Sequence, residues 1–263
     1  MFRAVVLALA SLAWACQPDF VVGQWSCMTS PGPVGRNDAG MVVPVRDAVA
    51  TPWTTGFEDA FCGYDDAKGW CYTDDASATY TTVASPVHSG RHAAAFTLNS
   101  GDGGTGKQAR CAREGTFPTD AYYGAWFYLP SLPQDVQNWN LFHFNAENDS
   151  DSNWNNLLDV TLVKTNGGFG LAIIDDRAGK SLGPAMPSAV PVGSWFYVEL
   201  RFVRSGTNGE LTLYQDHQQV FDVSGINTDP YQYDQWYVGN LVASTSQPDL
   251  TVYVDDVSLS TTQ

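Results

Sequence analysis

Residues 195–225 constrain the fold of this chain more than any other segment, because they carry three strand patterns in a row. In residues 195–203 every second side chain is apolar, which is the period of a half-buried β-strand. The face predicted to be buried holds Phe196, Val198, Leu200 and Phe202. An Asn208-Gly209 turn follows, and both of these residue types tolerate positive φ. A second strand through Leu211 and Leu213 and a third over residues 218–223 complete a predicted run of antiparallel strands.

This run resembles the late strands of the concanavalin A-like jelly roll, and residues 252–260, VYVDDVSLS, resemble its closing strand. The tight turn that is usually Asp-Gly in that fold reads Asp216-His217 here. Legume-type lectins, many glucanases, and the alginate-lyase and heparin-lyase families share the fold. The resemblance covers residues 53–263 and implies an all-β protein, a two-sheet antiparallel β-sandwich. A shared fold does not by itself determine the chemistry.

Three regions are expected along the chain. Residues 1–15 are predicted to be a signal peptide, because Arg3 precedes an apolar stretch, 4–15, that is too short to span a bilayer. Residues 16–52 are rich in Pro and Gly without a sustained period, which predicts a flexible tether. Strand signals recur from Trp53 onward, so residues 53–263 are predicted to form one β domain, which the resemblance implies is a jelly roll that acts on carbohydrate.

The signal sequence predicts an extracellular or cell-surface protein. Cys16 follows a small-x-small cleavage pattern that also resembles a bacterial lipobox, so two interpretations stand: a lipoprotein acylated at Cys16, or a freely secreted protein. The only membrane attachment expected is that lipid.

The cysteines predict disulfides, since the mature protein meets an oxidising compartment. If Cys16 is acylated, four cysteines remain, and four can form two disulfides. A Cys62–Cys71 disulfide would close a short loop and leave Cys27 to pair with Cys111 by elimination, although three pairings are open.

The net charge of −15 argues against nonspecific binding of nucleic acid. It also disfavours a strongly anionic polymer as ligand, unless the positive charges are concentrated in one groove.

Acidic residues at the two ends of the domain predict a structural calcium ion. Glu58 lies near its start and Asp255 and Asp256 near its end, and the two ends of a jelly roll are often adjacent strands. The buried phase changes between Val254 and Val257, which predicts a β-bulge at the Asp pair. Carboxylate oxygens suit calcium. The alternative is a solvated strand end.

Resemblance to the alginate and heparin lyases implies three places for a catalytic site. Residues 110–114 stand where those families carry an Arg-x-Glu-like strand, residues 140–145 at a Gln-x-His-like strand, and three tyrosines at a late tyrosine-rich strand. The catalytic candidates are Arg113, His143, Tyr233 and Tyr237. Elimination beside a uronate needs a cation or amide for the carboxylate, a base for the C5 proton, and a proton donor for the leaving oxygen.

Strand periodicity predicts the orientation of His143. Phe142 and Phe144 share a face and should point into the core, so His143 should point to the other face together with Leu141 and Asn145. If that face is the concave sheet, His143 looks into a groove.

Further candidates for substrate binding are Arg110, Asn145, Trp139 and Tyr128. Sugar rings present CH groups that pack on aromatic faces, so tryptophan and tyrosine suit such a platform. Most large aromatics are nevertheless expected to fill the core of a two-sheet sandwich.

The leading functional prediction is a secreted or surface-anchored protein that binds a polysaccharide in the concave groove. The alternative is a polysaccharide lyase that cleaves a uronate-containing glycan by β-elimination, and a second alternative is a non-catalytic adhesion or structural protein. A glycoside hydrolase is less well supported, because nothing requires Glu114 and Glu199 to face each other. The four histidines lack zinc-site spacing.

Overall fold

The structure is a computed structural model. It describes residues 35–36, 42–43, 51–64, 69–73, 78–99, 107–133, 136–147, 154–184, 187–228, 233–245 and 249–263. The predicted signal peptide, Cys16 and most of the predicted tether lie outside these residues. Within the tether, the short strands β1 (Gly35–Arg36) and β2 (Val42–Val43) pair with each other.

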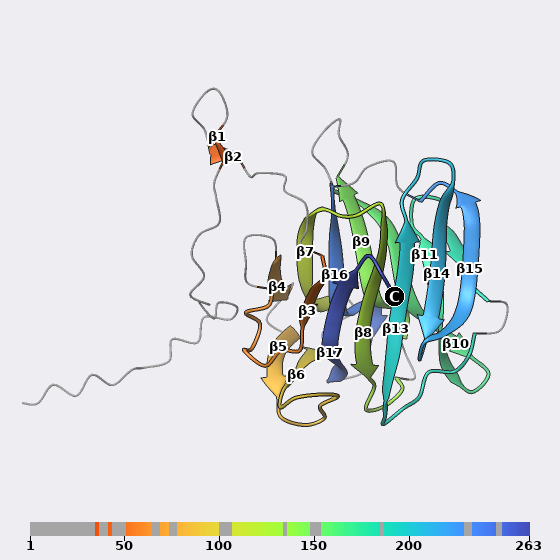
Figure 1. Ribbon diagram of the computed structural model, residues 1–263. Coiled ribbons are helices and arrows are strands. Elements are labelled where there is room, and N and C mark those ends of the chain that lie inside the picture. Colours follow the sequence, from red (N-terminus) through yellow and green to blue (C-terminus); the bar gives the residue numbers. More distant parts are fainter. Residues whose placement is uncertain are drawn as a thin grey trace, which may run out of the picture.

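Most of the described residues belong to two antiparallel sheets that stack face to face (Figure 1). The seven-stranded sheet contains, in spatial order, β12 (Lys180–Leu182), β11 (Gly168–Asp175), β10 (Trp154–Thr165), β9 (Val136–Glu147), β16 (Tyr233–Thr245), β7 (Lys107–Thr116) and β4 (Gly69–Thr73).

The eight-stranded sheet contains, in spatial order, β15 (Gln218–Ile226), β14 (Gly209–Gln215), β13 (Trp195–Val203), β8 (Asp120–Tyr128), β17 (Leu250–Ser260), β6 (Ala93–Leu98) and β5 (Ala78–Val83). The short strand β3 (Trp53–Thr55) also pairs with β17. The chain is therefore an all-β jelly-roll sandwich, as the sequence predicts. No helix long and apolar enough to cross a membrane occurs in the part of the chain that is described.

The predicted strands of residues 195–225 form as β13, β14 and β15. The four apolar side chains of β13 are completely buried, while Arg201 on the opposite face binds Asp120 and Glu210. Asp216 and His217 have φ of 50° and 63°, the left-handed conformation that a tight hairpin turn needs. These two residues thus form the tight turn that Asp-Gly usually forms, although neither of them is glycine.

Large apolar side chains from both sheets fill the space between them. Phe127 of the eight-stranded sheet packs on Phe142 of the other, with ring centroids 5.5 Å apart, and Tyr123 packs edge-on against Phe144 and Trp236. All five side chains are shielded from solvent. The prediction that Phe142 and Phe144 point into the core is confirmed.

The bulge predicted in the last strand is also present. The register of β17 against β8 shifts between Asp255 and Ser258, and Asp256 has a φ of 45°. The bulge moves Val257 and Leu259 onto the buried face that Val254 occupies before it.

The predicted disulfide pairing is wrong. Cys71 of β4 is bonded to Cys111 of β7, its direct partner across the two strands. Cys62, expected to pair with Cys71, belongs to a different disulfide. Sequence spacing favoured the short loop between Cys62 and Cys71, whereas the sheet register brings Cys111 opposite Cys71.

Candidate functional site

A β-bulge in β9 places two polar residues on the outer face of the seven-stranded sheet, away from the core. Against β10, Phe142 pairs with Val160 and Asn140 with Thr161, so Leu141 is the extra residue. Strict alternation would put Asn140 and His143 on opposite faces. Because of the bulge, both reach the same pocket.

Alternation had predicted that Leu141 shares the face of His143, and this prediction is wrong because of the bulge. Leu141 is buried in the core beside Phe142. The prediction for His143 itself and for Asn145 agrees with the structure, since both lie opposite residues of β16 that point outward, Tyr237 and Gln235.

A second bulge, in β10, likewise places two polar residues on the outer face of the sheet. Asn156 pairs with Asn145 and Leu158 with Phe144, so Leu157 is extra. Leu157 and Leu158 are both buried, while Asn156 and Asp159 line the pocket.

Asp176, in the turn that follows β11, joins this group. Its backbone N–H donates to the carbonyl of Leu157, 3.2 Å away, which ties the turn to the bulge of β10. Burial, together with the negative charge of Asp159, raises the pKa of Asp176 to about 6.

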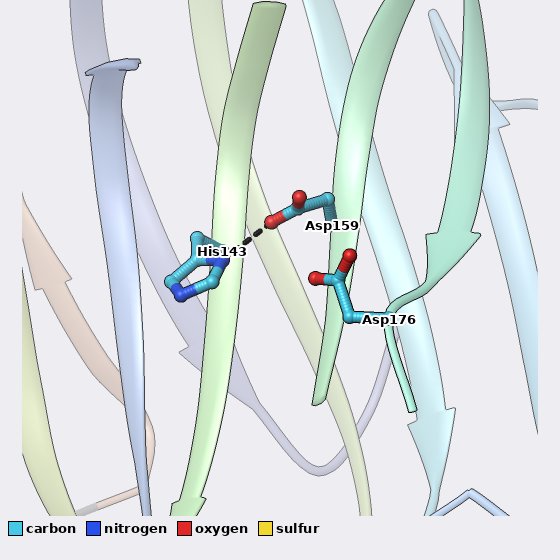
Figure 2. A group of neighbouring side chains, drawn as sticks. All are labelled: His143, Asp159 and Asp176. Carbon is cyan, nitrogen blue, oxygen red and sulfur yellow. Dashed lines mark hydrogen bonds and ion pairs between the residues drawn. The ribbon is translucent and has the colours of Figure 1, made fainter. Parts of the chain in front are cut away.

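His143 and Asp159 form a buried pair, with Nδ1 2.5 Å from Oδ1. The other carboxylate oxygen of Asp159 accepts from the side-chain amide of Asn140 at 2.6 Å. Figure 2 shows the carboxylates of Asp159 and Asp176 gathered on one side of the imidazole, with the second ring nitrogen directed away from Asp159. When Nδ1 carries the proton of a neutral ring, Nε2 is left with a free lone pair.

Arg110 of β7 supplies the positive charge of the site. Its Nε donates to the hydroxyl of Tyr72 at 2.9 Å, and its guanidinium lies 4.1 Å from the centre of the Tyr237 ring. Although Nη1 is buried, it has no hydrogen-bond partner. A buried guanidinium with an unused N–H is suited to an incoming carboxylate.

Gly239 of β16 permits this packing. The register of β16 against β9 shifts between Val238 and Leu241. Gly239 has a φ of +148°, and a Cβ there would lie 2.7 Å from Cα of Arg110. Any other residue would push β7 and its arginine away from β16.

The tyrosines of β16 belong to a chain of hydrogen bonds beside the pocket. The hydroxyl of Tyr237 donates to Gln235, whose amide donates to Glu114 at 2.5 Å, and Tyr233 donates to the same carboxylate at 2.7 Å. The centroid of the Tyr237 ring lies 5.4 Å from the centroid of the His143 ring. Burial raises the pKa of Tyr237 to about 12, so its phenol stays protonated near neutrality.

A pocket of about 380 Å³, a size typical of small-ligand sites, lies beside Arg110 and His143. Its lining is mainly polar and comes from β7, β9, β10, the end of β11, and β16. The polar lining includes Arg110, Asn140, His143, Asp159 and Asp176.

Three predicted site residues lie elsewhere. Arg113 points to the core side of β7, where its guanidinium stacks 4.2 Å from the centre of the Trp53 ring. Trp139 is completely buried and donates to Asn240 at 3.0 Å.

Tyr128 lies on the eight-stranded sheet against Trp195 and Tyr253. Tyr233 is connected to the site only indirectly, through its hydrogen bond to Glu114.

The acidic residues proposed for calcium gather around one loop, residues 88–92. Asp255 accepts backbone N–H bonds from His88 at 3.0 Å and from Ser89 at 3.1 Å. Asp256 contacts the ring of His88 at 2.7 Å, and Glu58 accepts from the backbone of residues 91 and 92. These backbone bonds lower the pKa of Glu58, whereas burial raises that of Asp255.

Sequence reasoning missed Asn140, Asp159 and Asp176. The first two are hidden because bulges break the alternation, and the third lies in a turn. One signal was present: the tetrapeptides 140–143, Asn-Leu-Phe-His, and 156–159, Asn-Leu-Leu-Asp, share the order polar, apolar, apolar, polar. Two adjacent buried residues between polar ones indicate a bulge in a strand.

Residues 58–258 match the family model described as polysaccharide lyase. No curated protein sequence matches the chain significantly.

Solved structures share the fold at low sequence identity. An endo-β-1,4-glucuronan lyase from the fungus Trichoderma reesei has a TM-score of 0.60 at 16% identity, covering 80% of this chain and 95% of that one. The cellulose-induced protein Cip1 has a TM-score of 0.56 at 16% identity, covering 80% and 97%. Alginate lyase Aly36B, in complex with an alginate trisaccharide, has a TM-score of 0.52 at 13% identity, covering 81% and 98%.

Proposed function

Because the chain belongs to the polysaccharide lyase family, we propose that it cleaves a uronate-containing polysaccharide by β-elimination in the pocket around His143. This replaces polysaccharide binding alone as the leading interpretation. The structurally similar proteins include lyases of glucuronan and alginate, both polymers of uronates, which supports this class of substrate.

The reaction requires one proton to be removed and one to be delivered. The base takes the proton from C5 of the uronate, the electron pair of that bond forms a C4–C5 double bond, and the C4–O bond breaks. The leaving oxygen then takes a proton from an acid. The developing negative charge next to the carboxylate must be stabilised by a cation or by hydrogen-bond donors.

Arg110 is proposed to stabilise that charge, and its unused Nη1 is the observation that carries the proposal. A buried N–H without a partner costs free energy unless a ligand satisfies it. A uronate carboxylate in the pocket would do so with a charge-assisted hydrogen bond. Arg110 takes the role predicted for Arg113, which faces the core.

His143 is proposed as the base. Asp159 accepts the hydrogen bond of Nδ1 and so favours the tautomer in which Nε2 can accept a proton. Once His143 is protonated, the carboxylate of Asp159 stabilises the imidazolium. Asn140 holds Asp159 in position through the other carboxylate oxygen.

Tyr237 is proposed as the acid that protonates the leaving oxygen. Its raised pKa keeps the phenol protonated, and its ring lies between Arg110 and His143 in contact with both. Asn145, which hydrogen-bonds Tyr237, is proposed to assist in binding the sugar.

We further propose that the protein acts outside the cytoplasm, which the Cys71–Cys111 disulfide supports. Acylation of Cys16 stays a prediction from the sequence. A structural calcium ion at Glu58, Asp255 and Asp256 is also proposed, because these carboxylates come from the two ends of the domain and each contacts the loop of residues 88–92.

The test is elimination itself. Purified protein is incubated with β-1,4-glucuronan and with alginate, and with a neutral glucan as control, while ultraviolet absorbance reports new unsaturated uronates. A rise with a polyuronate that is absent in His143→Gln supports the proposal. Retention of the protein by a glycan without any rise would contradict cleavage and restore the binding interpretation.

A further inference from the structure

Three potential metal ligands meet in the lining of the pocket, and they come from three separate elements. His143 lies on β9, Asp159 on β10 and Asp176 after β11 (Figure 2). One ligand atom from each lies within 4.8 Å of the other two. Over the described stretches of the chain, no other group of His, Cys, Asp or Glu meets this condition.

The pocket contains more acidic than cationic side chains. Asp159 and Asp176 line it, against Arg110 as its one cationic side chain among the described residues. Arg110 donates to the hydroxyl of Tyr72 and packs on the Tyr237 ring. A bound cation would relieve the repulsion between the two carboxylates.

Asn140 provides an independent indication of a missing ligand. It is only 5% exposed and lines the same pocket. Its amide nitrogen donates to Asp159, but its carbonyl oxygen Oδ1 has no hydrogen-bond donor. Buried acceptors are almost always satisfied, so an unsatisfied one indicates a donor, water or ion that occupies the pocket in solution.

We propose that His143, Asp159 and Asp176 bind one divalent transition-metal ion of the Zn²⁺ type. Imidazole together with carboxylates suits such ions better than Mg²⁺ or Ca²⁺, which prefer oxygen ligands alone. Three protein ligands leave a position open toward the pocket, where Asn140 Oδ1, water or a sugar oxygen would complete the coordination.

The inference rests on the proposed function in one respect, its effect on activity. A neutral imidazole that ligates a metal through one nitrogen keeps its proton on the other, and so has no lone pair left for the C5 proton. Binding also replaces the short bond between His143 and Asp159. Zn²⁺ therefore inhibits elimination reversibly, and a chelator restores it.

The first measurement is metal binding, which does not depend on activity. Protein without a histidine tag is stripped with a chelator, dialysed, and titrated calorimetrically with ZnCl₂ and then, separately, with MgCl₂. One equivalent of Zn²⁺ should bind at the site, and Mg²⁺ should not compete. Asp176→Asn should weaken Zn²⁺ binding by at least about 10-fold.

Asp175→Asn is the matched control, because it removes the same charge one residue away. Asp175 accepts from the backbone of Ala178 and does not belong to the cluster. Circular dichroism confirms that both variants are folded. Near-normal affinity in Asp175→Asn supports ligation by Asp176, whereas equal losses in the two variants, or no saturable binding at all, would overturn the site.

Activity separates this inference from the proposed function. Loss of elimination as the calorimetric site fills supports both. Full activity with that site saturated would retain the metal site but overturn His143 as the base. Zn²⁺ binding by a protein that cleaves no glycan would leave the site standing and contradict the lyase.

Discussion

The imidazole of His143 and the carboxylate of Asp159 lie 2.5 Å apart on neighbouring strands, both nearly closed to solvent. They are direct partners in the register of β9 and β10. The bulges on either side bring Asn140 and Asn156 to the same face. The sheet thus fixes the ring orientation of the proposed base before any substrate arrives, which is a requirement for efficient proton transfer.

Substitutions of this pair are expected to reduce turnover strongly. His143→Gln removes the base and should lower kcat by about 10²- to 10⁴-fold. Asp159→Asn should lower kcat with a smaller effect on KM, because it disturbs the tautomer of His143 rather than substrate contacts. Initial rates from the ultraviolet assay measure both. Asp222→Asn, a change in the exposed part of β15, is the control, and unchanged kcat in His143→Gln would contradict the assignment.

The two arginines of β7 are expected to behave differently. Arg110→Gln should reduce kcat/KM by about 10- to 100-fold, since a charge-assisted hydrogen bond to the uronate is lost. Arg113→Gln should instead lower the free energy of unfolding by about 3 kcal/mol, because Arg113 is buried against Trp53. Denaturant titration and kinetics on the same preparations separate the effects. The reverse pattern would return Arg113 to the catalytic role.

Much of the fold could be predicted from the sequence, because the alternation of side chains is continuous in β13 and β14 and is broken in β17 only at the bulge. The bulge at Asp255 was visible as a change in buried phase between Val254 and Val257. The proposed catalytic pocket was only partly predictable. His143 and Tyr237 follow from alternation and the family resemblance, while Asn140 and Asp159 depend on bulges.

Arg110 and Arg113 show what spacing alone leaves undecided. They are three residues apart on one strand, so they must face opposite sides, but the sequence does not say which side is the core. The register decides: Arg113 is opposite Trp236, which is completely buried, and Arg110 is opposite Gly239. The prediction of the disulfide pairing failed for a similar reason, since the pairing of Cys71 with Cys111 depends on the register of β4 against β7.

Removal of the Cys71–Cys111 disulfide should destabilise the protein without abolishing its site. A sequence separation of 40 residues corresponds to about 4 kcal/mol of loop-closure entropy in the unfolded chain. Guanidinium titration of the double variant Cys71→Ser/Cys111→Ser measures the loss. Both substitutions are made together so that no free thiol is left to exchange with Cys62. A stability equal to that of the parent would show that the crosslink constrains little.

Calcium removal should lower the thermal midpoint if Glu58, Asp255 and Asp256 hold an ion. Calcium at 100 times its dissociation constant would stabilise the folded protein by about 2.7 kcal/mol. Differential scanning calorimetry with and without a chelator measures the shift. Asp256→Asn should abolish the response, whereas Asp176→Asn should retain it. An identical midpoint with and without chelator in the parent protein would exclude a structural calcium ion here.

The buried hydroxyl of Tyr64 should limit stability at alkaline pH. Tyr64 is completely buried between Trp53 and Phe57, and its hydroxyl has no hydrogen-bond partner. Burial raises the pKa of Tyr64 far above its ordinary value. The folded state therefore holds this proton more tightly than the unfolded state, so its contribution to stability is complete below the unfolded pKa of about 10 and is lost as the pH rises above it.

Tyr64→Phe should accordingly move the alkaline unfolding midpoint to higher pH. At neutral pH it should leave the free energy of unfolding unchanged or raise it by about 1 kcal/mol, since an unsatisfied polar group is removed without a cavity. Tyr80→Phe is the matched control, because its hydroxyl donates to the carbonyl of Cys71 and its loss should cost about 1 kcal/mol. If Tyr64→Phe destabilised the protein as much as the control, the hydroxyl of Tyr64 would have to be hydrogen-bonded in solution.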